Sequence, residues 1–176
     1  MIKINIIPSG KNKGYTLICV MALLLLMHFT AYSQEPPPRP IAIYVNPAQG
    51  LIFGAFFHGP SGGSVIIYPD GSRSVTGSVV QANLGFPFSS AIFEIDANPG
   101  TLIAIMNGPD VNLSGSGGGT LSLHIGTAST GTPFVATATS PARTQVRIGG
   151  TLTVGNMLAN PAGSYSGMFS VTFIQE

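Results

Sequence analysis

Charged side chains and cysteines are scarce in this chain of 176 residues. Only 7% of the residues are charged, and the single cysteine is Cys19. All lysines lie before residue 14, so residues 34–176 carry four arginines against six acidic residues, a formal charge of −2. A nucleic-acid-binding surface normally presents a basic stripe that neutralises several phosphates. We therefore expect no nucleic-acid partner.

Low charge does not indicate disorder here. The chain is 44% apolar, whereas disordered chains combine few apolar residues with high net charge. Its polar positions are mostly Gly, Ser, Thr and Asn, which predicts a folded domain with a neutral surface. Such a surface lacks the charge that keeps β-proteins apart, so contact with copies of itself or with another surface is one reading, and a bland exterior without a partner is the other.

The N-terminus has the pattern of a secretory leader. Three lysines precede the uncharged apolar run 15–29, and Ala31-Tyr32-Ser33 supplies small residues at positions −3 and −1 of a cleavage site. Fifteen apolar residues are fewer than the roughly twenty that cross about 30 Å of hydrocarbon. We expect cleavage before Gln34, export to the periplasm, the cell surface or the medium, and no membrane insertion afterwards. Cys19 lies inside the apolar run, so a lipid anchor is not expected.

Removal of residues 1–33 leaves one domain preceded by a short spacer. The spacer, residues 34–40, holds four prolines and is expected to be extended. Residues 41–176 form the predicted domain, which contains no cysteine and must be held together by burial and strand pairing.

Apolar runs separated by turn residues predict an all-β domain. Asp70-Gly71 between two such runs is the clearest hairpin signal, and no long run with a helical period follows the leader. We predict an Ig-like antiparallel β-sandwich, with a jelly roll or open barrel as the alternative. The expected strands are 41–45, 51–57, 65–68, 72–80, 91–96, 101–106, 120–125, 134–139, 146–154 and 164–174. The expected breaks are Asn46-Pro47, 60–63, 69–71, 85–89, 98–100 and 114–119.

The last run alternates apolar residues and small hydroxyls, which is the period of a half-buried strand. Its apolar side is Tyr165, Phe169, Val171 and Phe173, and its polar side is Ser164, Ser166, Ser170 and Thr172. Tyr165 lies between Gly163 and Gly167, where its hydroxyl is expected to bond a nearby carbonyl as a tyrosine corner does. We assign structural roles to Tyr165, Gly163, Gly167 and Gly150.

No group of side chains indicates catalysis, a cofactor or a metal. Residues 34–176 contain two histidines: His58 is expected in an exposed turn and His124 on the polar face of its strand, so neither completes a triad or a zinc site. Glu94 and Asp96 share a strand face at a spacing that suits a calcium pair, but a solvated face explains them better. Loop capping accounts for Asn107, Asp110 and Asn112. We predict that the protein is not an enzyme.

Several motifs follow one another in a recognisable order: Leu51-Ile52-Phe53-Gly54, residues 63–73, Ala91-Ile92-Phe93-Glu94-Ile95, residues 148–154 and residues 161–167. This series resembles the bacterial domain-of-unknown-function 4402 family over nearly the whole of residues 34–176. The closing strand is similar to that of spore-coat-U-like and other fimbria-related secreted domains. The resemblance implies an exported, pilin-like sandwich with no assigned activity and no catalytic residue to carry over.

Two functions remain open. The first is a structural or adhesive surface component that contacts itself or other surface proteins through strand edges. The second is a monomeric module that recognises a glycan or another extracellular ligand through loops 85–89 and 114–119, with Phe86 and Phe88 as stacking rings. For these two rings we expect packing into the core instead.

Overall fold

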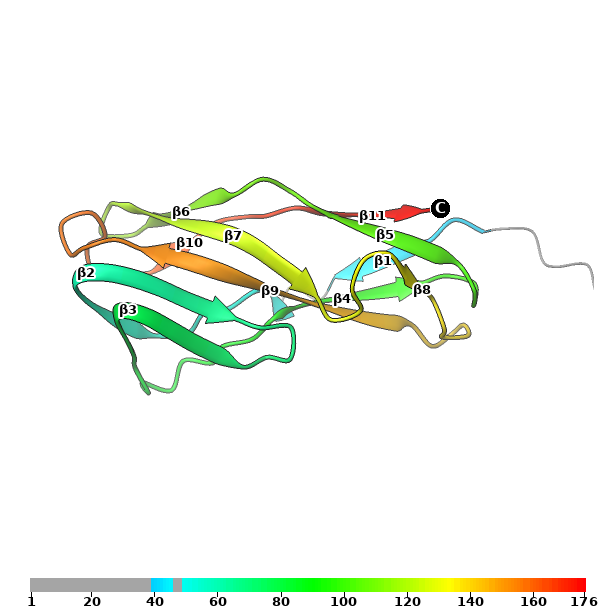
Figure 1. Cartoon of the computed structure of the whole chain (residues 1–176), viewed down its shortest axis with the longest axis horizontal. Helices are drawn as coiled ribbons and strands as arrows, with labels where there is room; N and C mark the ends of the chain where they lie inside the picture. The colour runs from blue at the N-terminus through cyan, green and yellow to red at the C-terminus, as the bar shows by residue number, and fades with distance from the viewer. Residues whose placement is uncertain (1–38, 46–48) are drawn as a thin grey trace, which may run out of the picture. The chain divides into compact units, whose positions relative to one another are not determined.

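The computed structural model describes residues 39–45 and 49–176, which form two antiparallel β-sheets (Figure 1). Among these residues there are eleven strands and no α-helix, so the predicted all-β antiparallel sandwich is confirmed. The predicted leader, residues 34–38 of the spacer and the break at Asn46-Pro47 lie outside the described residues.

The large sheet has eight strands and is organised around β9. One edge of β9 pairs with β4 in its first half and with β2 in its second half, while the other edge pairs with β7. The strands follow the order β1-β4-β9-β7-β6-β10, and β3 pairs with β2. Their bounds are β1 Ala42–Val45, β2 Phe56–Ile67, β3 Arg73–Gln81, β4 Ala91–Asp96, β6 Val111–Gly115, β7 Thr120–Ala128, β9 Thr144–Val154 and β10 Tyr165–Ser166.

The small sheet has three strands in the order β11-β5-β8. Strand β5 spans Leu102–Asn107, β8 spans Phe134–Val135 and β11 spans Val171–Gln175. Alternate side chains of each strand point toward the large sheet. Ile103 is completely buried, and the rings of Phe93 and Phe173 lie 5.4 Å apart, centroid to centroid, where β4 of the large sheet meets β11 of the small one.

The predicted hairpin at Asp70-Gly71 joins β2 to β3. The Gly71 N–H donates to the Tyr68 carbonyl at 2.9 Å, and Gly71 has a φ of +86°, a conformation that glycine adopts without strain. The Asp70 carboxylate accepts hydrogen bonds from the hydroxyl and N–H of Ser72 at 2.6 and 2.8 Å, which lowers the pKa of Asp70. The turn is therefore fixed by its own side chains.

The predicted break at residues 60–63 is wrong. These residues belong to β2, where the register with β3 shifts between His58 and Gly63. A bulge absorbs extra residues and bends the strand instead of reversing it, and Gly62 and Gly77 there have φ values of +67° and +66°. His58 consequently lies in a strand and is half-buried, not in an exposed turn.

Other element bounds also differ from the prediction. Of the run 51–57, only the last two residues belong to a strand, β2. Ile52 makes an isolated bridge to Ser89 instead. The run 134–139 keeps two strand residues, and Ser114 and Gly115 end a strand, β6, that was not predicted. The run 164–174 divides into β10, in the large sheet, and β11, in the small sheet. Glycine and proline in the sequence indicate that the chain changes direction, but they do not distinguish a bulge within a strand from a turn between strands.

Candidate functional site

The outer face of the small sheet is apolar and exposed. Leu102, Met106, Val135 and Ile174 are 36%, 57%, 50% and 40% exposed. Strand register places Leu102 beside Val135, Ala104 beside Ile174, and Met106 beside Thr172. We call these residues the outer face; none of them is charged. Contiguous apolar surface of this kind is uncommon on monomeric soluble proteins and marks interaction sites.

The outer edge of β11 adjoins this face. On the β5 side, the Gly108 N–H donates to the Ser170 carbonyl at 2.9 Å and the Glu176 N–H donates to the Leu102 carbonyl at 3.0 Å. Because hydrogen-bonded pairs alternate in an antiparallel ladder, Thr172 and Ile174 complete the bonds to β5. The backbone groups of Val171, Phe173 and Gln175 therefore point away from β5. Within residues 39–45 and 49–176, no strand or backbone hydrogen bond meets them. We call them the open edge.

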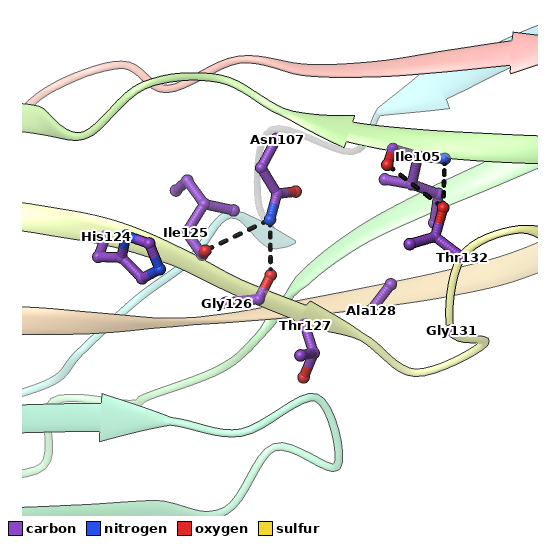
Figure 2. A pocket seen from close by; sticks show the side chains of 9 residues that line it. All are labelled: Ile105, Asn107, His124, Ile125, Gly126, Thr127, Ala128, Gly131 and Thr132. Atoms are coloured by element: carbon purple, nitrogen blue, oxygen red, sulfur yellow. Dashed lines mark hydrogen bonds between the residues drawn. The ribbon is translucent and has the colours of Figure 1, made fainter.

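The opposite edge of the small sheet is closed by a side chain (Figure 2). Strand β8 pairs with β5 only at Leu102 and Ile103. Beyond it, the Thr132 hydroxyl accepts a hydrogen bond from the Ile105 N–H at 2.8 Å and donates to the Ile105 carbonyl at 3.3 Å. One threonine thus provides both hydrogen bonds that a neighbouring strand would make.

A pocket of about 350 Å³ lies next to this closed edge, between β5 and β7. Figure 2 shows Asn107 reaching across it, where the side-chain amide donates to the carbonyls of Ile125 and Gly126 at 3.3 and 2.9 Å. His124 lies at the rim, and its Nδ1 is 2.7 Å from the Asp110 carboxylate. Asn107 and Asp110, for which we expected loop capping, instead contact β7 separately.

The preferred interpretation of Phe86 and Phe88 is wrong, because both rings are outside the core. Phe86 is 65% exposed and Phe88 is 41% exposed. The Arg73 guanidinium lies 4.3 Å from the Phe88 ring centroid, and it donates to the carbonyls of Phe53 and Ala55 at 2.9 and 3.2 Å. Arg73 therefore fixes Phe88 against the body of the domain, a contact that strand patterning did not reveal.

Tyr165 lies at the junction of β10 with the loop before it. Its hydroxyl donates to the Pro161 carbonyl at 2.7 Å, four residues earlier in the chain. A side chain at Gly115 would meet the Tyr165 ring, one at Gly163 would meet the Ser116 hydroxyl, and one at Gly167 would meet Leu113. A larger residue at any of these three glycines would therefore collide with a neighbouring side chain.

Gly150 and its neighbour Gly149 differ in what surrounds them. A Cβ on Gly150 would meet the end of the Leu51 side chain at 2.7 Å, whereas a Cβ on Gly149 would meet the backbone carbonyl of Ile67. A side-chain end can move and a paired strand cannot, so Gly149 has the stricter requirement. The two residues form one Gly-Gly pair in the sequence, which does not reveal this difference.

Asn160 is a structural residue that sequence reasoning missed. It is 3% exposed, its carbonyl accepts from the Gly155 N–H, and its amide donates to the carbonyls of Thr120 and Ala159. It joins the loop after β9 to the start of β7. Asn160 lies in the loop Asn156–Asn160, and nothing in the sequence of this loop indicates that its side chain is buried.

The acidic pair Glu94 and Asp96 is held by arginines. Glu94 accepts from Arg143 at 3.0 Å, a hydrogen bond that raises the pKa of Arg143, and Asp96 accepts from Arg39 at 2.7 Å. The Arg143 guanidinium also lies 3.5 Å from the centre of the Tyr44 ring. These contacts join β1, β4 and the start of β9, which gives both acids a structural role.

Within the described ranges, no three His, Cys, Asp or Glu residues are grouped to hold a metal ion. The same part of the chain contains no helix long and apolar enough to span a bilayer.

The described residues form a two-sheet antiparallel sandwich whose small sheet has an exposed apolar outer face. A family model described as Domain of unknown function (DUF4402) matches residues 43–174. This match covers most of the chain, which therefore belongs to that family, as the spaced motifs predicted. No curated protein and no solved structure matches the chain.

Proposed function

We propose that this protein is an exported, non-enzymatic structural or adhesive component of the cell surface, which contacts its partners through the small sheet. The observation that carries the proposal is the uncharged outer face beside the open edge. An exposed apolar sheet face and a row of unpaired backbone groups favour association with another β-structure.

Charge and composition support the same function. Residues 34–176 contain no lysine, the residue that most often protects strand edges from association. The leader pattern of residues 1–33 supports export, and the fimbria-like resemblance of the closing strand supports a place at the surface.

The non-enzymatic assignment rests on the contacts of the titratable side chains. Asp110 pairs with His124, and Glu94 and Asp96 pair with arginines on the surface of the domain. These partners give each group a structural explanation, and none of the pairs contains a nucleophile activated by a base.

A matched pair of methionines tests the proposal. The whole chain is expressed in a bacterial host with its leader, and mass spectrometry determines the N-terminus, expected at Gln34. Binding to the surface of the producing cells, or association in solution, is then measured for Met106→Glu and Met157→Glu. These methionines are 57% and 66% exposed, on the outer face and on the loop after β9.

Loss of binding or association in Met106→Glu, with retention in Met157→Glu, is the expected result. Equal behaviour of the two variants, or an intact leader on a protein that stays inside the cell, would contradict the proposal.

The exposed rings favour a second candidate, a monomeric module that binds a glycan. Phe86 and Phe88 offer aromatic faces of the kind that sugars stack on, and Arg73 holds Phe88 in place. Binding of surface polysaccharide in affinity electrophoresis should be lost in Phe86→Ala and kept in Leu158→Ala, whose native side chain is 93% exposed elsewhere. A wild-type protein that is monomeric and binds the polysaccharide would favour this candidate over the first.

A further inference from the structure

We propose that the occupant of the open edge is a second copy of this chain, with the two β11 strands antiparallel around a two-fold axis at Phe173. The two small sheets would then form one continuous sheet across the dimer. This inference rests on the proposed function, because it names the partner of the same edge.

The backbone selects this register. A two-fold axis at Phe173 places Val171 opposite Gln175 of the second copy and Phe173 opposite Phe173. These are the residues whose N–H and C=O groups point away from β5. Every N–H and C=O group that points away from β5 therefore faces such a group of the other copy, as the hydrogen-bonded pairs of an antiparallel ladder require.

The side chains fit the same register. Thr172 lies opposite Ile174 of the second copy, and both belong to the outer face. The charged residue that directly follows the strand, Glu176, lies opposite Ser170 and not opposite another carboxylate. No like charges therefore meet directly across the pair, which would otherwise oppose association.

Several other edges in the described part of the chain are shorter or less regular than that of β11, and the free edge of β1 has four residues. The β5 edge is closed by Thr132, and β10 has only two residues. Strand β3 pairs with the bulged strand β2 and curls until the Arg73 guanidinium reaches the Gln81 side chain at 3.3 Å. Strand β11 has no proline, lysine or bulge in its five residues. Regular, uncharged edges of this kind pair readily with another strand.

A five-residue strand buries little area, so the expected dimer is reversible and depends on concentration. Sedimentation velocity across a wide range of protein concentration measures it, on protein expressed with its leader and purified in the form that the host produces. The wild-type protein is expected to change from monomer to dimer as concentration rises.

Two double variants test the register. Thr172→Lys with Ile174→Lys places like charges opposite each other and should leave only monomer. Thr172→Lys with Ile174→Glu places opposite charges there and should restore the dimer, less so at high salt. Val135→Lys adds the same charge to the same face two strands away and should keep the dimer. Circular dichroism and thermal unfolding verify that each variant is folded.

Cysteine pairing gives a second measurement if the charged variants unfold. In an antiparallel ladder, directly opposite residues that do not hydrogen-bond to each other, as Thr172 and Ile174 of the second copy would be, lie about 4.5 Å apart between Cα atoms. This distance is within the reach of a disulfide. Disulfide dimers should form from a mixture of Thr172→Cys and Ile174→Cys chains, and much less from either alone. Equal yields in all three samples would overturn the register.

The outcomes separate the two proposals. Open-ended polymers that Met106→Glu abolishes would keep the structural function and overturn the two-fold dimer. A wild-type protein that stays monomeric yet binds cells through Met106 would do the same. A monomer that binds neither cells nor itself would overturn both.

Discussion

Replacing Asn160 with alanine should destabilise the domain far more than its position in a loop suggests. The side chain is 3% exposed and bonds to Gly155, Thr120 and Ala159. Truncation leaves the Gly155 N–H and the Thr120 carbonyl without a protein partner. Each buried unpaired group costs about 1–3 kcal/mol, so the free energy of unfolding should fall by about 3 kcal/mol. For a domain of this size, that loss lowers the melting temperature by roughly 10 °C.

Asn156 provides a matched control in the same loop. Its side chain accepts hydrogen bonds from the N–H groups of Leu158 and Ala159 at 3.1 and 3.0 Å, but it is exposed. Water can replace those bonds, so Asn156→Ala should cost only about 0.5–1 kcal/mol. Urea unfolding at 25 °C, followed by circular dichroism, measures both variants.

Asn160→Asp separates hydrogen bonding from packing, because it keeps the shape and replaces the amide donor with a second acceptor. The new carboxylate would face the Thr120 carbonyl, which raises its pKa above the unfolded value. The folded state then binds protons more tightly, so stability relative to wild type should rise as pH falls from 7.5 to 4.5. Equal costs for Asn160→Ala and Asn156→Ala, or a pH-independent Asn160→Asp, would refute the reasoning.

Three further substitutions have expected outcomes in the same unfolding assay. Tyr165→Phe should cost about 1 kcal/mol through its lost hydrogen bond, and Tyr165→Ala about 2 kcal/mol because the ring is half-buried; an unchanged melting temperature in both would contradict the corner role. Gly149→Ala should cost about 3 kcal/mol, and Gly150→Ala nearer 1 kcal/mol, since the nearest atom to a new Cβ is a backbone carbonyl at Gly149 and the end of a side chain at Gly150; the reverse order would be inconsistent with the packing. Thr132→Val should speed amide exchange at Ile105 and cost about 1 kcal/mol, whereas unchanged exchange would show that the hydroxyl does not close that edge.

Much of the fold was predictable from local patterns. Period-two alternation located β4, β5, β7 and β9 to within a few residues, because alternation reflects burial on one side of a strand. The turn at Asp70-Gly71 was predictable because its chemistry is local. The bulge near Pro60 was not, since whether glycine and proline bend a strand or reverse it depends on the strand that pairs with it.

The site was less predictable, because exposure depends on which strands become neighbours. Phe86 and Phe88 carry the same sequence signal as core aromatics, and only the fold leaves them outside. Ile174 did carry a usable signal, since it occupies the position where the alternation of Ser166, Ser170 and Thr172 demands a polar residue. An apolar residue on the polar side of a strand is a sign of an exposed apolar surface when its neighbours on adjacent strands are apolar as well.

The division of residues 164–174 between two sheets explains why the open edge exists. Alternation continues through the run because Tyr165 and Phe173 both face the interior, although one belongs to β10 and the other to β11. Residues 167–170 carry the chain from the large sheet to the small one, where β11 lies at the edge beside β5. If β11 is the contact strand, a proline at Gln175, whose N–H points away from β5, should weaken association while leaving the β5 ladder and the melting temperature nearly unchanged. A large loss of stability in that variant would instead show that the edge is already bonded within one molecule.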